Sequence, residues 1–174
     1  RLGAQKPLNI IFNNASTLED LAGKLASQIQ ADSLALISAF KSELFFSTYN
    51  MDESSSRKLF IPNTYEVYWT ISPVDFLERM QKEYTKFWTD NRLAKAKSLG
   101  LTAHQVSVLA SIVQKETSKT DEQPIVAGLY LNRLKMDMKL QSDPTVIYAI
   151  QERDGFEKTI KRVLKKDLKI NSPY

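Results

Sequence analysis

The sequence predicts an α+β protein in which a small N-terminal α/β unit precedes a mostly helical domain. A strand-like segment and two helical segments occupy about 45 residues at the N-terminal end, and further helix-start signals recur along the second half of the chain. A chain of 174 residues can form one ordinary domain or two small ones. A composition of 43% hydrophobic and 25% charged residues is typical of a folded globular protein.

The first unit is predicted from one strand and two capped helices. Pro7–Phe12 is short, apolar and rich in β-branched residues, which predicts a strand. Ser16 and Glu19 have the spacing of a capping box, and apolar residues follow at helical spacing: Leu18, Leu21, Ala22, Leu25 and Ile29. Asp32 or Ser33 is expected to cap a second helix, whose apolar residues are Leu34, Ile37 and Phe40.

A polar stretch at residues 52–57 (DESSSR) predicts the boundary between the two units. We therefore expect a first subdomain over residues 1–50 and a second domain over residues 51–174. The second domain begins with Leu59–Trp69, which is rich in aromatic residues and is interrupted by Pro62.

Ser72 followed by Pro73 predicts the start of a long helix that continues to Gly100. Its apolar stripe is Val74, Leu77, Met80, Tyr84, Phe87 and Trp88. Thr102 and Gln105 form a second predicted capping box, which opens a helix from Ala103 to about Ser118.

Two further helices are predicted by proline. One begins at Pro124 and runs to about Met136. Another begins at Asp143 and Pro144, with Asp143 as the cap, and runs to Ile150. Residues 157–170 fit either a helix or a β-hairpin.

Composition excludes several kinds of chemistry. The chain has no cysteine and one histidine, so thiolate catalysis, a histidine-based triad and a multi-histidine metal site are not expected. We expect no metal and no cofactor. No apolar run approaches the ~20 residues of a membrane-spanning helix. Because the sequence begins with Arg1 rather than methionine, we expect it to be part of a longer protein.

The net charge of +4 has two possible interpretations. It indicates either a polyanionic partner or an excess of lysine on solvated helix faces. The most basic stretch, Lys158 to Lys169, contains no pair of aromatic residues for base stacking. Nucleic acid is therefore not expected as a partner.

Glu116 is the candidate acid/base residue. It lies seven positions after Leu109 and three after Val113, so it falls within the apolar stripe of its predicted helix. A carboxylate on such a stripe would be partly desolvated, which suits a general acid near neutral pH. The alternative is a surface charge near the helix end that pairs with Lys119.

Other polar residues interrupt apolar positions downstream. Asn132 follows Ile125 and Leu129 at helical spacing, which predicts an inward-facing amide. Arg133 follows directly. A second polar group surrounds a predicted helix start: Gln141, Ser142, Asp143 and Thr145. Asp143 and Thr145 could be helix caps, but together these residues predict a cleft that suits the hydroxyl and N-acetyl groups of a sugar.

These residues lie in segments that resemble the YceG-like family, whose characterised members are endolytic murein transglycosylases. The resemblance covers nearly the whole chain in the expected order. The segments that carry it are Leu59–Tyr65 (LFIPNTY), Leu109–Thr117 (LASIVQKET), Leu131–Leu134 (LNRL) and Leu140–Tyr148 (LQSDPTVIY).

The resemblance implies an enzyme that cuts N-acetylmuramic acid–N-acetylglucosamine bonds within nascent peptidoglycan strands and leaves 1,6-anhydro ends. It implies a LysM-like N-terminal subdomain and a lysozyme/transglycosylase-like catalytic domain. The catalytic glutamate is carried onto Glu116, and Gln114 stands where many relatives have a second acidic residue. The predicted substrate-binding residues are Asn132, Arg133, Gln141, Ser142, Asp143, Thr145 and Tyr148.

The resemblance also implies a location and partners. Peptidoglycan glycan strands are the expected substrate, and peptidoglycan synthases or division proteins are candidate protein partners. A single N-terminal membrane anchor outside this sequence would hold the catalytic part in the periplasm or extracytoplasmic space. The family continues past the position of Tyr174 with a Gly-Leu-Pro-Pro-Gly type loop, so we expect a C-terminal continuation.

Two alternatives stay open at this point. One is a non-catalytic peptidoglycan-binding or cell-division scaffold protein. The other is a lysozyme-like hydrolase, which needs a second carboxylate about 5–9.5 Å from the first. Asp143 is the candidate for that second carboxylate.

Overall fold

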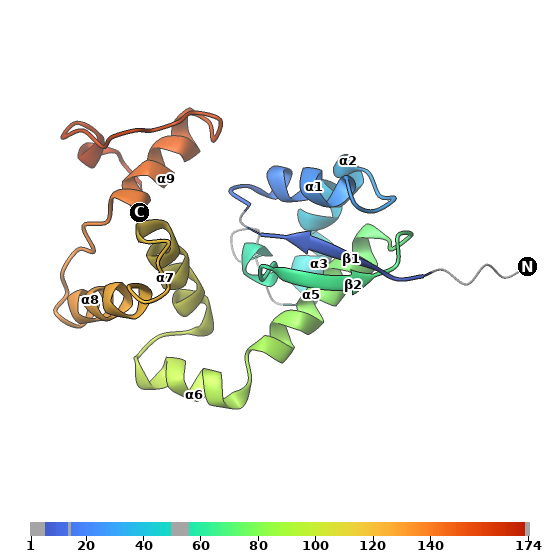
Figure 1. The fold of residues 1–174 in the computed structure, drawn as a ribbon, viewed down its shortest axis with the longest axis horizontal. Coiled ribbons are helices and arrows are strands. Elements are labelled where there is room, and N and C mark those ends of the chain that lie inside the picture. Colours follow the sequence, from blue (N-terminus) through green and yellow to red (C-terminus); the bar gives the residue numbers. More distant parts are fainter. Residues whose placement is uncertain (1–5, 14, 50–55, 173–174) are drawn as a thin grey trace, which may run out of the picture. The chain divides into compact units, whose positions relative to one another are not determined.

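A computed structural model describes residues 6–13, 15–49 and 56–172 of the chain. It divides into two compact units, residues 1–91 and 92–174 (Figure 1). The sequence predicts a division after residue 50, and residues 52–55 of the predicted boundary lie outside the described residues. The units divide later because a strand from residues 63–67 pairs with the N-terminal strand and so belongs to the first unit.

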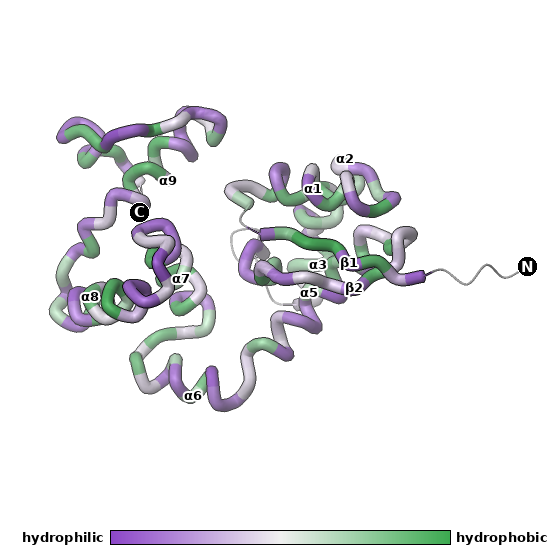
Figure 2. The backbone as a smooth tube through the Cα atoms, viewed as in Figure 1, coloured by the Kyte–Doolittle hydropathy of each residue, from purple (hydrophilic) through white to green (hydrophobic). Residues whose placement is uncertain are grey.

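A two-stranded antiparallel sheet organises the N-terminal unit. The predicted first strand is confirmed as β1 (Leu8–Phe12), which is a green, hydrophobic stretch in Figure 2. It pairs with β2 (Asn63–Val67), Leu8 opposite Val67 and Phe12 opposite Asn63. Alternate residues of both strands are buried on one face of the sheet, as expected when one face covers a core: Ile10, Phe12, Tyr65 and Val67.

Helices cover the buried face of this sheet. They are α1 (Leu18–Ala26), α2 (Ser33–Phe40), α3 (Glu43–Thr48), the 3₁₀ helix η1 (Arg57–Leu59) and α5 (Pro73–Phe87). Their apolar faces meet in a core with a large aromatic component, in which Phe12 stacks on Tyr65 at 5.3 Å between ring centroids. This arrangement confirms the coarse α+β prediction.

Two details of the first helices differ from the predictions. The cap of α1 is Thr17, whose hydroxyl accepts from the Asp20 backbone N–H, and the Asp20 carboxylate accepts from the Ser16 backbone N–H. The motif therefore lies one residue later than predicted, which leaves Glu19 to pair with Lys41. Of the two residues predicted to cap α2, Asp32 is the cap. Leu34, which the sequence assigns to its apolar face, is exposed.

The predicted long helix from Pro73 to Gly100 is two helices. α5 ends at Phe87 and α6 spans Asp90–Ser98. Thr89 and Asp90 are residue types typical of a helix start, so this local signal interrupts the long apolar stripe. The predicted stop at Gly100 is confirmed, since its φ is +74° and the Leu101 N–H bonds back to the Ala96 carbonyl.

The described part of the C-terminal unit contains three further α-helices. The capping box of Thr102 and Gln105 opens α7 (Ala103–Glu116) as predicted. α8 spans Gln123–Lys135 and α9 spans Asp143–Asp154, one turn longer than predicted. Residues 157–170 form neither the helix nor the hairpin expected, because only the short 3₁₀ helix η2 (Asp167–Lys169) is regular there.

α7 packs against both α8 and α9. The buried centre of this packing is Leu109, Val113 and Tyr130, with partly buried side chains around it: Leu101, Ile112, Val126, Ala127, Leu131 and Leu140. In the described parts of the chain, no helix has the length and apolar character needed to cross a membrane.

Candidate functional site

The carboxylate of Glu116 joins three segments of the C-terminal unit. Glu116 is the last residue of α7. Its Oε2 atom accepts a hydrogen bond from the Tyr130 hydroxyl of α8 at 3.0 Å and another from the Ser142 hydroxyl, just before α9, at 3.2 Å. Residues from three positions far apart in sequence therefore meet at one carboxylate oxygen.

Helical spacing explains how α7 and α8 supply two of these groups. Leu109 and Val113 are buried, and Glu116 continues their stripe by one further turn. Tyr130 is only 3% exposed and packs in the same core, so its ring is fixed while its hydroxyl reaches the helix end. The pKa of Tyr130 is raised, first by burial and further by its hydrogen bond to Glu116. The phenol is therefore neutral at physiological pH and acts as a donor.

Ser142 is the third member of the cluster. It occupies the N-cap position of α9, which the sequence assigns to Asp143, yet its hydroxyl makes no capping hydrogen bond. The side chain is 2% exposed and its hydroxyl donates to Glu116 instead. The buried serine thus gives up a capping interaction that usually stabilises a helix by about 1 kcal/mol.

Glu116 itself is exposed, so the prediction that its side chain is desolvated by the apolar stripe is wrong. The reason is that α7 ends at this residue, and no further helical turn covers it. The alternative partner Lys119 forms an ion pair with Glu122 at 2.8 Å instead. The pKa of Glu122 is lowered by that lysine and by the Thr117 hydroxyl.

Gln141 and Arg133 form a second contact beside this cluster. The Arg133 Nη1 atom donates to the Gln141 Oε1 atom at 2.9 Å and to the Lys139 carbonyl at 3.1 Å. Gln141 has a φ of +54°, a left-handed conformation that is costly for a residue with a side chain. This pair of predicted substrate-binding residues therefore shapes the loop that delivers Ser142.

Three more predicted residues lie on the first half of α9. Asp143 is exposed in the first turn of the helix. The Thr145 hydroxyl donates to the Ser142 carbonyl at 2.8 Å, and the Tyr148 ring lies edge-on to Phe156 at 5.5 Å. Thr145 therefore supports the position of Ser142, and substrate contact by these residues stays a prediction.

Asn132 lies elsewhere on α8. Ile125 and Leu129, with which it shares a face, are 74% and 51% exposed, so the predicted inward stripe is wrong. Asn132 is exposed two positions after Tyr130, which is about 200° around the helix. The inward face is instead the one formed by Val126, Ala127, Tyr130 and Leu131.

Tyr130 is the member of the cluster that the sequence argument does not identify. Val126 and Tyr130 are four residues apart, which is the same helical signal as that of Ile125 and Leu129. Reading this second stripe as the buried one would have placed the tyrosine hydroxyl towards α7.

The chemistry available to this cluster is proton transfer by a single carboxylate. Both hydroxyl donors hold Oε2, and among the described residues no hydrogen bond is made to Oε1. The carboxylate is therefore oriented through one oxygen while the other can exchange a proton. Across the described ranges, no group of three or more histidine, aspartate or glutamate side chains is placed to hold a metal ion.

The N-terminal unit carries a separate surface concavity of about 220 Å³. Its lining residues come from the ends of the two strands and from α5: Pro7, Glu66, Val67, Tyr68, Ile71 and Arg79. None of the residues predicted for the site lines it.

The family model described as the YceG-like family matches residues 1–174. An endolytic murein transglycosylase of Bacillus subtilis (strain 168) is 33% identical over 100 residues, which cover 58% of this chain and 26% of that protein. One of Streptococcus pneumoniae serotype 2 is 30% identical over 131 residues, which cover 75% of this chain and 20% of that protein.

The matched segments thus span about a quarter or a fifth of these relatives. The fold is similar to a 2.6 Å crystal structure of a yceG-like protein from Listeria monocytogenes, with a TM-score of 0.71 and 22% sequence identity. That similarity covers 96% of this chain and 58% of the Listeria chain.

Proposed function

Because the chain belongs to the YceG-like family, we propose that it is part of an endolytic lytic transglycosylase that cleaves peptidoglycan glycan strands. The observation that carries the proposal is the carboxylate of Glu116, held through one oxygen by the hydroxyls of Tyr130 and Ser142. The names of the B. subtilis and S. pneumoniae relatives support the same activity. It is a non-hydrolytic elimination, formally a carbon–oxygen lyase reaction.

The mechanism needs one residue to give a proton and then take one. Protonated Glu116 donates to the glycosidic oxygen as the bond from the N-acetylmuramic acid C1 atom breaks, which gives an oxocarbenium-like state. The resulting carboxylate removes the proton of the sugar's own C6 hydroxyl, and its oxygen bonds to C1. This closes the 1,6-anhydro ring, regenerates protonated Glu116 and consumes no water.

The geometry around Oε2 suits this double role. Tyr130 and Ser142 are neutral donors on buried residues, so they orient the carboxyl group without adding a second charge. Oε1 is the atom that we assign to proton transfer. The loop of Arg133 and Gln141 lies next to Ser142 in the chain and supplies amide and guanidinium groups for sugar hydroxyl and N-acetyl oxygens. Asn132, on the opposite face of α8 from Tyr130, has no geometric support for this role.

The finer parts of the proposal concern the whole protein. We assign the N-terminal unit as a LysM-like glycan-binding subdomain, supported by an antiparallel strand pair whose buried residues share a core with α1 and α2. We also assign the chain to an extracytoplasmic protein with a single N-terminal membrane anchor, on the basis of the family resemblance. Peptidoglycan synthases and division proteins are the corresponding candidate partners.

The test is Glu116→Gln in the full-length protein, assayed on isolated peptidoglycan. This change keeps the side chain's shape and removes its acid/base function, so activity should fall at least ~10²-fold. Glu152→Gln, which alters an exposed carboxylate of α9, is the matched control and should retain activity. Near-normal turnover by Glu116→Gln would end the assignment, and inactivity of the parent protein would favour a non-catalytic scaffold.

A further inference from the structure

The positive charge of the chain is concentrated in one segment after α9. Residues 158–170 hold six lysine and arginine side chains and one aspartate, a net charge of +5. The whole chain has a net charge of +4, so the remaining residues together carry −1. We call residues 158–170 the basic segment. Its charge is therefore a local feature and not part of a generally basic surface.

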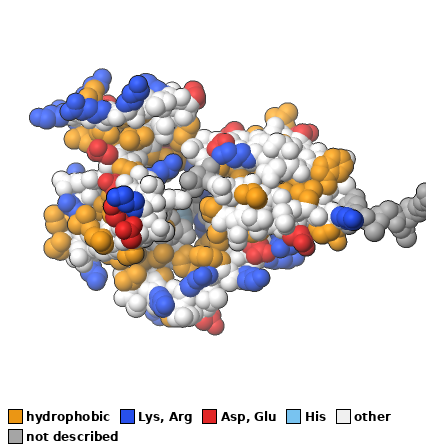
Figure 3. All heavy atoms as spheres, viewed as in Figure 1, with side chains coloured by type: hydrophobic (Ala, Val, Ile, Leu, Met, Phe, Trp, Pro, Cys, Tyr) orange, Lys and Arg blue, Asp and Glu red, His pale blue; other side chains and the backbone are white. Residues whose placement is uncertain are grey.

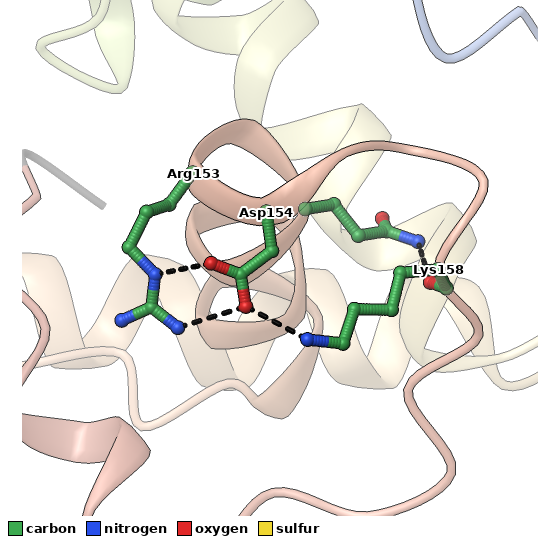
Figure 4. Close-up of polar contacts among 4 residues, drawn as sticks. Arg153, Asp154 and Lys158 are labelled. Atoms are coloured by element: carbon green, nitrogen blue, oxygen red, sulfur yellow. Dashed lines mark hydrogen bonds and ion pairs between the residues drawn. The ribbon is translucent and has the colours of Figure 1, made fainter.

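Most of these cations have no carboxylate partner among the residues that the structure describes. Lys158 has such a partner, because its ammonium group contacts the carboxylate of Asp154 at 2.9 Å. Arg153 binds the same carboxylate (Figure 4). The Asp167 carboxylate accepts from the Leu164 backbone N–H at 2.8 Å. The ion pairs among the described residues include none of the other five cations, which are all exposed: Lys161, Arg162, Lys165, Lys166 and Lys169. Figure 3 shows lysine and arginine side chains gathered at this end of the C-terminal unit.

Apolar side chains alternate with these cations and are also exposed. Leu164 and Leu168 are 46% and 63% exposed, and each has a lysine next to it or one position away. Exposed leucines beside unpaired lysines match the interface of an anionic membrane, where the leucines enter the acyl boundary and the lysines meet headgroup phosphates. A nucleic acid would instead favour aromatic side chains for base stacking, and residues 158–170 contain none.

We propose that the basic segment is a membrane-surface binding site for anionic phospholipid headgroups. Each lysine or arginine close to an anionic membrane strengthens binding by about fivefold at physiological salt. The five unpaired cations therefore supply most of the affinity, and the two leucines add an apolar contribution that a water-soluble polyanion cannot use.

Along the chain, the basic segment and the residue that contacts Glu116 lie beyond opposite ends of α9. Ser142 contacts Glu116 just before α9, and the basic segment begins after its other end. A helix of 12 residues is about 18 Å long. One helix length therefore separates the carboxylate from the start of the lipid-binding segment, and both belong to the same compact unit.

The test measures binding of the chain to vesicles by co-sedimentation. Vesicles rich in phosphatidylglycerol should bind the chain, and pure phosphatidylcholine vesicles should not. The triple variant Lys161→Gln, Lys165→Gln and Lys166→Gln should bind about 100-fold more weakly. The control triple variant Lys86→Gln, Lys95→Gln and Lys97→Gln has the same net charge and alters exposed lysines elsewhere, so it should retain nearly full binding.

A second pair of variants separates lipid from other polyanions. Leu164→Ser with Leu168→Ser should weaken vesicle binding about tenfold. The same change should leave binding to inorganic polyphosphate unaltered, because polyphosphate has no acyl chains. Equal losses of vesicle binding in the two triple lysine variants would overturn the proposal in favour of a non-specific charge effect. Vesicle binding that is unchanged by the two leucine substitutions would overturn it in favour of a soluble polyanion.

Discussion

The two hydroxyls on Glu116 predict a specific pattern of activity loss. Tyr130→Phe and Ser142→Ala each remove one donor to Oε2, at 3.0 and 3.2 Å, with little change in side-chain volume. Either single variant leaves the other hydroxyl to orient the carboxyl group. The double variant leaves an exposed carboxylate at the end of α7 with neither of these hydroxyl donors.

The expected magnitude follows from the hydrogen bonds. A hydrogen bond to a charged group is worth about 1.5–3 kcal/mol, and solvent at the exposed Glu116 reduces this to about 1 kcal/mol. Each single variant should therefore lower kcat about fivefold. The double variant should lose more than the product of the two single losses, about 50-fold or more. KM should change little, because both hydroxyls donate to the Glu116 carboxylate, which would keep them from contacting the substrate.

The assay is release of soluble fragments from purified peptidoglycan by the full-length protein, with kcat and KM measured separately. Ser107→Ala is the matched control, because it removes a hydroxyl on α7 whose hydrogen bond, among the described residues, goes to the Ala103 carbonyl. Circular dichroism confirms that each variant is folded. Wild-type kcat in the double variant would refute the positioning role of these hydroxyls. A rise in KM with unchanged kcat would mean that they contact substrate instead.

Two other predictions concern stability. Gln141→Gly and Gln141→Ala both remove the contact with Arg133, but only glycine adopts the positive φ of +54° without strain. Chemical denaturation should therefore show the glycine variant to be more stable than the alanine variant by about 1 kcal/mol. Equal stabilities of the two variants would contradict strain at this position. The Arg153 and Lys158 hydrogen bonds hold the pKa of Asp154 well below its usual 3.8, so Asp154→Asn should lower the melting temperature at pH 7. Because this stabilisation is fully present above pH 3.8 and is lost only as pH falls towards the lowered pKa, the difference should shrink below pH 3; a difference that stays constant down to pH 2 would refute it.

Local signals predict the starts of most helices of this chain, although not those of α3 and α6. Capping residues have direct partners in the structure, as at Thr102 with Gln105 and at Ser72 with the Asp75 backbone N–H, because such interactions depend only on residues three apart. The pairing of β1 with β2 depends on residues about 55 positions apart in the sequence, which no local pattern encodes. For that reason the two compact units divide later along the chain than the polar stretch at residues 52–57 predicts.

The sequence predicts only some of the residues of the candidate site. Glu116 and Ser142 meet as a cluster, although the burial that the stripe of α7 implied for Glu116 does not extend to the helix end. On α8, two apolar stripes compete, and the sequence alone does not say which one faces α7. Packing selects the stripe of Val126 and Tyr130, so Asn132 lies on the exposed face and the tyrosine joins the carboxylate. Tertiary contacts decide between faces that helical periodicity leaves equivalent.

In the proposed reaction, the carboxyl group of Glu116 gives and then recovers a proton without water entering the reaction. Mass spectrometry of the muropeptides released by the full-length protein tests this most directly. We expect cleaved ends that carry 1,6-anhydro-N-acetylmuramic acid, with no solvent oxygen incorporated when the reaction is run in ¹⁸O-labelled water. Reducing ends that contain the heavy oxygen would identify a hydrolase and contradict the elimination at Glu116.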